Sequence, residues 1–181
     1  MKKLYIPLLL VFIIAAAFMQ QGCDILNNLF LNQSLKQSIV ATGSTNPITQ
    51  SEMFCLSDYD AFNDNVDDIQ GIKYLSAAYF TEKYSPSDLG ATNITVTLRS
   101  TSDNEDIFTV NIPNASASNY INNPYKIELN ANDIAKFNQY LAEFKTNDCY
   151  YAKLSLNATG SGTEYSLTGR IEIVIEMEMK P

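Results

Sequence analysis

Hydrophobic and polar residues alternate along much of the chain, and the alternation is longest near the carboxyl end. Between Tyr165 and Met179 every second residue is apolar or aromatic except Gly169, and the residues between them are mostly polar or charged. A period of two over such a length is typical of a β-strand with one buried face. Gly169 is the expected place of a bend or bulge in this strand.

The same alternation predicts further strands upstream, for a total of seven or eight. Residues 150–163 follow the pattern, and Gly160, Ser161 and Gly162 predict a turn that joins this segment to the last strand. We therefore expect the two segments to form a long antiparallel hairpin. The other strand candidates are 71–84, 93–100, 106–113 and 125–130, and the segments 27–33, 36–42 and 51–57 are weaker candidates.

Two segments depart from the period of two. Ile134, Phe137, Leu141 and Phe144 are spaced by three, four and three residues, which predicts a helix with one apolar face. An asparagine at position 130 or 132 is suited to cap its amino end. A second, short helix is expected within residues 57–70, opened by the serine or aspartate at positions 57 and 58.

Many strands with one buried face and a single longer helix favour two packed antiparallel sheets over a parallel α/β fold. The expected fold class is mainly β: an antiparallel β-sandwich, immunoglobulin-like or jelly-roll-like, with one crossing α-helix near residues 131–145. The chain of 181 residues is long enough for one such domain. We assign it to residues 51–181, preceded by a tether at 23–50 that includes the first strand candidates.

Composition narrows the function classes. The chain has no His, which removes the commonest general base and metal ligand, and the sequence shows no nucleophile, phosphate-loop or zinc motif. We therefore expect a non-catalytic protein without a cofactor. The net charge is −8, and no cluster of Lys and Arg follows the first three residues, which argues against nucleic acid as a partner.

The amino terminus carries an export pattern. Met1, Lys2 and Lys3 give a positive start, and residues 4–18 are uncharged and almost all apolar. This run is shorter than the roughly 20 apolar residues that span a bilayer comfortably, and it matches the layout of a cleaved signal peptide. An ordinary secreted protein and an uncleaved amino-terminal anchor are the alternatives.

The pair Gly22-Cys23 after this run resembles the signal peptide of bacterial lipoproteins, although Gln20 and Gln21 stand where that family usually has Leu and a small residue. The resemblance implies a signal peptide at 1–22, cleavage before Cys23 and acylation of that residue. Two or three fatty chains on one residue hold a protein durably at a membrane. The expected location is the bacterial cell envelope, on the periplasmic or surface face of the outer membrane.

If Cys23 is acylated, two of the three cysteines remain, Cys55 and Cys149. Outside the cytoplasm they can form a disulfide, which would close a loop of about 95 residues and stabilise the fold by about 4 kcal/mol in the chain-entropy model. Two buried free thiols are the alternative. From about Phe54 onward the chain also resembles a type of uncharacterised envelope lipoprotein of the Bacteroidota, and this resemblance bears on location and fold only.

An acidic segment is the one candidate metal site. Oxygen ligands on a short loop suit calcium, but the segment lacks the glycine and the closing glutamate of an EF-hand loop. A solvated loop with helix-capping aspartates explains the same residues. The weak calcium candidates are Asp58, Asp60, Asp64, Asp67 and Asp68.

Aromatic residues offer a second candidate site, because sugars stack on exposed rings. Tyr120, Tyr125 and Tyr151 lie at strand ends or on outward faces, which suggests glycan binding, whereas tyrosine is also an ordinary strand residue. The sequence thus predicts a lipid-anchored envelope protein that is a structural or binding module of unknown ligand, with an envelope protein or a glycan as candidate partners. The alternative is a surface glycan-binding or adhesin-like module, followed by an unrecognised hydrolase.

Overall fold

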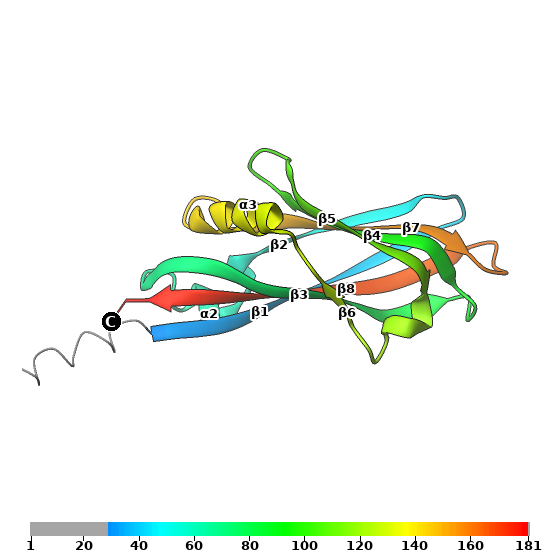
Figure 1. Cartoon of the computed structure of the whole chain (residues 1–181), viewed down its shortest axis with the longest axis horizontal. Helices are drawn as coiled ribbons and strands as arrows, with labels where there is room; N and C mark the ends of the chain where they lie inside the picture. The colour runs from blue at the N-terminus through cyan, green and yellow to red at the C-terminus, as the bar shows by residue number, and fades with distance from the viewer. Residues whose placement is uncertain (1–28, 181) are drawn as a thin grey trace, which may run out of the picture.

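The computed structural model describes residues 29–180. In this range the chain forms eight β-strands, one long α-helix and three short helical segments (Figure 1). The strands are β1 Leu29–Gly43, β2 Ile48–Cys55, β3 Ile69–Ser85, β4 Gly90–Ser100, β5 Asp106–Ser116, β6 Tyr125–Ile127, β7 Cys149–Thr159 and β8 Tyr165–Met179. The helices are η2 Leu56–Asp58, α2 Asp60–Asn63, η3 Ala117–Tyr120 and α3 Ala131–Ala142.

The strands form two four-stranded sheets that pack face to face, with the orders β1-β8-β3-β6 and β2-β7-β4-β5. We call them the first and second sheet. The antiparallel partners are nested from the ends of the chain inward: β1 with β8, β2 with β7, β3 with β6 and β4 with β5. This nesting is the strand order of an eight-stranded jelly roll. The expected mainly β sandwich is confirmed, and the strand order selects the jelly roll.

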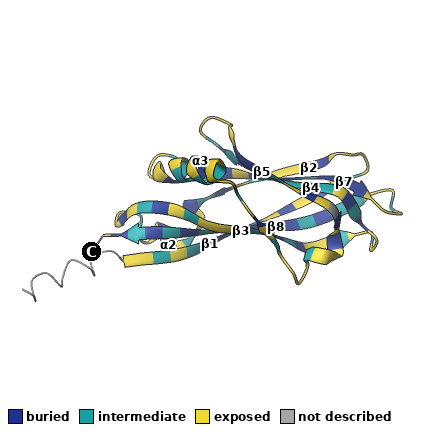
Figure 2. Cartoon of the chain, viewed as in Figure 1, coloured by how far each residue is buried: buried dark blue, intermediate teal, exposed yellow. Residues whose placement is uncertain are grey.

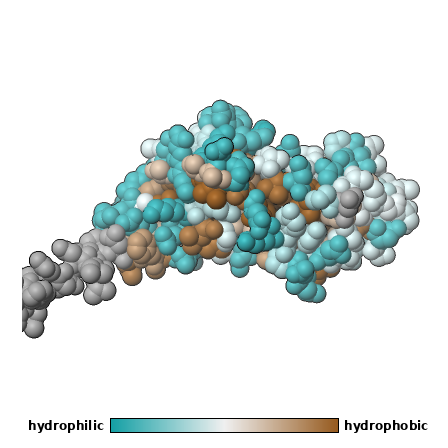
Figure 3. All heavy atoms as spheres, in the orientation of Figure 1, coloured by the Kyte–Doolittle hydropathy of each residue, from teal (hydrophilic) through white to brown (hydrophobic). Residues whose placement is uncertain are grey.

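The core lies between the sheets and follows the alternation of the sequence. In β8 the buried residues alternate with half-buried ones from Leu167 to Met179, as the period of two predicts. Figure 2 shows buried residues alternating with more exposed ones along the strands of both sheets. Figure 3 shows apolar atoms along the line between the two layers and hydrophilic atoms over the turn between β4 and β5.

The expected hairpin between the last two strands is wrong. β7 pairs with β2 and β4 in the second sheet, whereas β8 pairs with β1 and β3 in the first, so residues 160–164 carry the chain from one sheet to the other. A Cβ atom on Gly169 of β8 would lie 2.8 Å from Cδ2 of Leu154 of β7, which places the two strands on opposite sides of the core. Alternation shows which face of a strand is buried but not which strand lies beside it.

The irregularity expected at Gly169 lies in the neighbouring strand. β8 pairs with β1 without a register shift, whereas β3 shifts register between Thr81 and Lys83, opposite Gly169 and Thr168. The extra residue is therefore Glu82 of β3. The close approach of the Tyr79 ring to Gly169 explains why a residue without a side chain stands here.

Helix α3 begins after Asn130, whose side chain accepts hydrogen bonds from the backbone N–H groups of Asn132 and Asp133. The expected capping by Asn130 is confirmed, and the helix ends at Ala142, three residues before the predicted end. Phe137 of the helix contacts the rings of Tyr74, Phe108 and Tyr150, which lie on three different strands. Helix α3 thus closes the core where the long strands of the first sheet extend beyond the second sheet (Figure 1).

The sandwich includes residues 29–50 of the segment that the sequence assigned to a tether with possible first strands. β1 pairs with β8 along its whole length, and the boundary expected at residue 51 falls inside β2. The expected short helix begins at Asp60 after Tyr59, while Ser57 and Asp58 form the preceding turn η2. The predicted signal peptide 1–22 and the predicted lipidation site Cys23 lie outside the described residues.

The helices within residues 29–180 include none that is both long enough and apolar enough to span a membrane.

Candidate functional site

A shallow hollow of about 280 Å³ lies on the outer face of the second sheet. We call it the Tyr151 hollow. It is bounded by strands β2, β7 and β4 and by the turn between β4 and β5. Its lining residues are Ser51, Arg99, Asn104, Tyr151 and Lys153.

The strand register builds the floor of the hollow as two rows. Met53, Tyr151 and Arg99 face one another across β2, β7 and β4 in the first row. In the second row, Lys153 lies between Ser51 and Thr97. Because side chains alternate between the faces of a strand, the buried Tyr150 and Ala152 point into the core while Tyr151 and Lys153 point outward.

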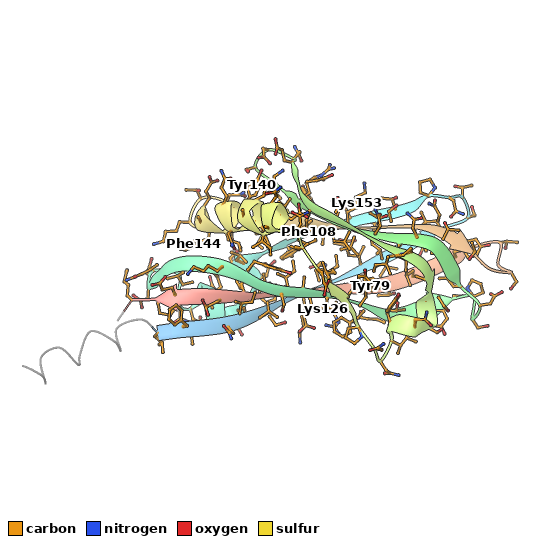
Figure 4. The ribbon with its side chains drawn as sticks, in the orientation of Figure 1. Tyr79, Phe108, Lys126, Tyr140, Phe144 and Lys153 are labelled. Atoms are coloured by element: carbon orange, nitrogen blue, oxygen red, sulfur yellow. A yellow bond between two sulfur atoms is a disulfide. The ribbon has the colours of Figure 1, made fainter. Side chains whose placement is uncertain are left out.

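The charges in the hollow are unequally neutralised. Nε of Arg99 donates a 2.7 Å hydrogen bond to Oδ1 of Asp106, and this bond with its ion pair raises the pKa of Arg99. Lys153 forms no ion pair with any residue of the described part of the chain. Figure 4 shows Lys153 on the side of the second sheet that faces away from the core. The hollow therefore carries one ammonium group without a counterion.

Helix α3 fixes the turn that forms the rim of the hollow. The hydroxyl of Tyr140 donates a 2.5 Å hydrogen bond to Asp103, and Lys136 donates to the carboxylate of Glu105 at 2.9 Å and to the carbonyl oxygen of Asp106 at 2.8 Å. The bond to Asp103 raises the pKa of Tyr140 to about 12 and lowers that of Asp103. The turn is thus held at several points, and Tyr140 lies on the outer side of α3 (Figure 4).

Asn104 has a left-handed backbone conformation in this turn. Its φ angle is 59°, in the left-handed region that asparagine adopts more readily than most residues. The side chains of Asn104 and Ser51 form no hydrogen bond within residues 29–180, so both can bind a ligand. Thr101 ties the turn to β7, because its hydroxyl lies 2.8 Å from the carbonyl oxygen of Cys149.

A disulfide joins Cys55 of β2 to Cys149 of β7 at the same end of the second sheet. The predicted pairing of these two cysteines is confirmed. The bond fixes β2 against β7 two residues away from Met53 and Tyr151, which face each other in the first row of the hollow. The floor and the rim are thus both positioned by interactions outside the hollow itself.

The structure separates the three tyrosines that suggested glycan binding. Tyr151 lines the hollow with 36% of its surface exposed. Tyr120 and Tyr125 pack edge to face with ring centroids 5.8 Å apart, and Tyr120 also contacts the buried Tyr79 of the first sheet. The three rings therefore do not form one platform.

The five aspartates that suggested calcium binding are not brought together in one cluster. Within residues 29–180 the only close group of acidic or sulfur ligands is Cys55, Asp148 and Cys149, and its two sulfur atoms are bonded to each other. The carboxylate of Asp58 accepts a hydrogen bond from the backbone N–H of Cys55 at 2.8 Å. The carboxylate of Asp68 lies 4.0 Å from the ammonium of Lys180.

A second hollow, of about 350 Å³, lies on the outer face of the first sheet, between β3, β6 and β8. Its charged groups already have partners: Glu172 binds Arg170 and Ser34, and Lys126 lies 3.4 Å from Glu128. It therefore has less charge available for a ligand than the Tyr151 hollow.

Comparisons with known proteins provide no family for this chain. No family of known sequences matches, and no curated protein matches. Among solved structures, the chain is similar to Desmodium yellow mottle tymovirus at 13% identity, over 83% of this chain and 90% of the other, with a TM-score of 0.36. It is also similar to a semi-empty virus-like particle of the Macrobrachium rosenbergii nodavirus at 10% identity, over 85% and 84%, with a TM-score of 0.42. At these values the likenesses carry no functional argument.

Proposed function

We propose that this protein is a lipid-anchored module of the bacterial cell envelope that binds a partner molecule and performs no catalysis. The observation that carries the proposal is the disulfide between Cys55 and Cys149. Disulfides form and persist in oxidising compartments outside the cytoplasm. With two of the three cysteines bonded to each other, Cys23 remains as the one thiol available for acylation.

The Tyr151 hollow supports binding as the activity of the exported domain. It combines an exposed aromatic ring, an unpaired ammonium group and a free hydroxyl group on its floor with a free amide group on a fixed rim. A small number of placed polar groups around an apolar surface is the usual composition of a binding site. The chain has no His to act as a general base beside these groups.

Fatty-acid labelling of the full-length protein tests the anchor. Wild type expressed in a bacterium should incorporate labelled fatty acid and sediment with the membranes, whereas Cys23→Ala should lose both properties. The double variant Cys55→Ala/Cys149→Ala is the matched control and should remain labelled. Unchanged labelling and sedimentation of Cys23→Ala would overturn the proposal.

A further inference from the structure

We propose that the Tyr151 hollow binds a sugar that carries a carboxylate, such as a uronic acid residue of a polysaccharide. The inference rests on the proposed function, because an envelope module meets such polymers outside the cytoplasm. Tyr151 provides the surface on which the sugar ring stacks, and Lys153 binds its carboxylate.

Tyr151 and its neighbour Met53 provide the apolar surface of the hollow. Their side chains face each other across β7 and β2, and both are exposed, Met53 to 56%. An amphipathic ring whose face is open suits a ligand that is apolar on one side and polar at its edge, as a pyranose is. The adjacent methionine extends this apolar surface.

The charge of the ligand follows from the cations. Lys153 has no counterion within the described residues, whereas Arg99, which lies opposite Tyr151 in the ladder between β4 and β7, is paired with Asp106. A carboxylate on the sugar would give Lys153 the partner that the protein does not provide. Of the carboxylates on the rim turn, Asp106 is paired with Arg99 and Glu105 with Lys136, while Asp103 accepts the hydrogen bond of Tyr140. Negative charges farther than about 8 Å are screened at physiological ionic strength.

The hydroxyl groups of a sugar match the rest of the hollow. Ser51 offers a hydroxyl, and Asn104 offers an amide that can donate and accept. The bonds from Tyr140 and Lys136 already order the turn that carries Asn104. Because this order exists before binding, the ligand does not bear the entropy cost of fixing the rim.

Calorimetric titration of the full-length protein in detergent tests the proposal. The probes are uronate oligosaccharides of three kinds, from polygalacturonate, alginate and a glucuronan, each compared with its methyl ester, which has the same chain without the charge. We expect at least one acid to bind at least tenfold more tightly than its ester.

The variants assign the roles of the two residues. Tyr151→Ala should weaken binding of acid and ester alike, and Lys153→Met should remove the preference for the acid. Lys126→Met, which changes a lysine in the second hollow, should bind as wild type does. Circular dichroism checks that each variant is folded.

Three results would overturn the inference: equal affinity for acid and ester, unchanged binding in both Tyr151→Ala and Lys153→Met, or no binding of any of the three acids. None of them decides whether Cys23 is acylated, because fatty-acid labelling measures that separately. Failure of the ligand assignment can therefore be distinguished from failure of the anchor.

Discussion

Cys55 and Cys149 lie directly opposite each other in the ladder between β2 and β7, and their sulfur atoms are bonded. The two residues are 94 positions apart in the sequence. Among the strands of residues 29–180, β2 is an edge strand of its sheet and pairs with β7 alone. The disulfide therefore fixes covalently a long-range pairing that otherwise depends on one ladder of hydrogen bonds.

Reduction of this disulfide should lower the free energy of unfolding by about 3 to 5 kcal/mol, because opening so long a loop increases the entropy of the unfolded chain. Denaturant unfolding with and without reductant measures the change. The double variant Cys55→Ala/Cys149→Ala should match reduced wild type and should not respond to reductant. Identical curves for oxidised and reduced wild type would contradict the prediction.

Gly169→Ala should destabilise the fold by about 1 to 3 kcal/mol, the usual cost of overpacking a core. The added Cβ would lie 2.7 Å from Cε2 of Tyr79 and 2.8 Å from Cδ2 of Leu154, and both side chains are fully buried. Gly71→Ala is the matched control, because its Cβ would meet only the carboxylate of Glu178 at 3.8 Å. Thermal unfolding of both variants measures the difference, and equal midpoints would refute the role given to Gly169.

The sequence predicts the buried faces well because the apolar residues of a buried face recur at short, regular intervals within one strand or helix. The alternation in β8 follows from the two-residue period of a strand. The spacing of Phe137 and Leu141 in α3 follows from the period of a helix, about 3.6 residues. No such local pattern shows which strands pair with each other in a sheet. The connection 160–164 is short enough for a hairpin, and the structure instead uses it to cross from the second sheet to the first.

The candidate site also combines a residue that the sequence predicts with residues whose proximity depends on strand pairing. Tyr151 is recognisable in the sequence as an outward aromatic residue, but nothing local connects it with Arg99 or Asn104, which belong to β4 and the turn after it. Their proximity depends on the register among three strands that are far apart in the chain. Register is set by the whole fold, so the hollow could not be predicted from the sequence.

Arg170→Gln should lower the free energy of unfolding by about 1 to 2 kcal/mol, since it removes ion pairs and a cation–π contact from a partly buried network. Arg170 binds Glu82 at 2.9 Å and Glu172 at 2.5 Å, and its Cζ lies 4.0 Å from the centre of the Phe80 ring. Denaturant unfolding at neutral pH measures the loss. The control is Lys126→Gln, whose ion pair with Glu128 is largely exposed and should contribute less than about 0.5 kcal/mol.

The same variant should change the titration of Glu172. Burial alone would raise the pKa of this carboxyl, but hydrogen bonds from Ser34 and Arg170 and the charge of Lys36 outweigh it, and the pKa is lowered. A lowered pKa means that the stabilisation is present above the unfolded-state pKa and is lost as the pH falls through the folded-state pKa. In Arg170→Gln the pKa should rise, which a carboxyl titration by NMR measures; an unchanged pKa would contradict this account.

Tyr140→Phe should loosen the turn that forms the rim of the Tyr151 hollow. It removes the 2.5 Å hydrogen bond to Asp103, which is the main reason that the pKa of this carboxyl is lowered. In wild type the bond stabilises the turn above the unfolded-state pKa of Asp103, and this contribution is lost as the pH falls through the lower folded-state value. The variant should therefore show a higher pKa for Asp103 and faster amide exchange in residues 101–105.

Tyr165→Phe, which removes a hydroxyl bonded to the carbonyl oxygen of Gly160, is the matched control and should change neither quantity. If the Asp103 titration is the same in wild type and Tyr140→Phe, α3 does not hold the turn through this bond, and the rim is not preorganised by it.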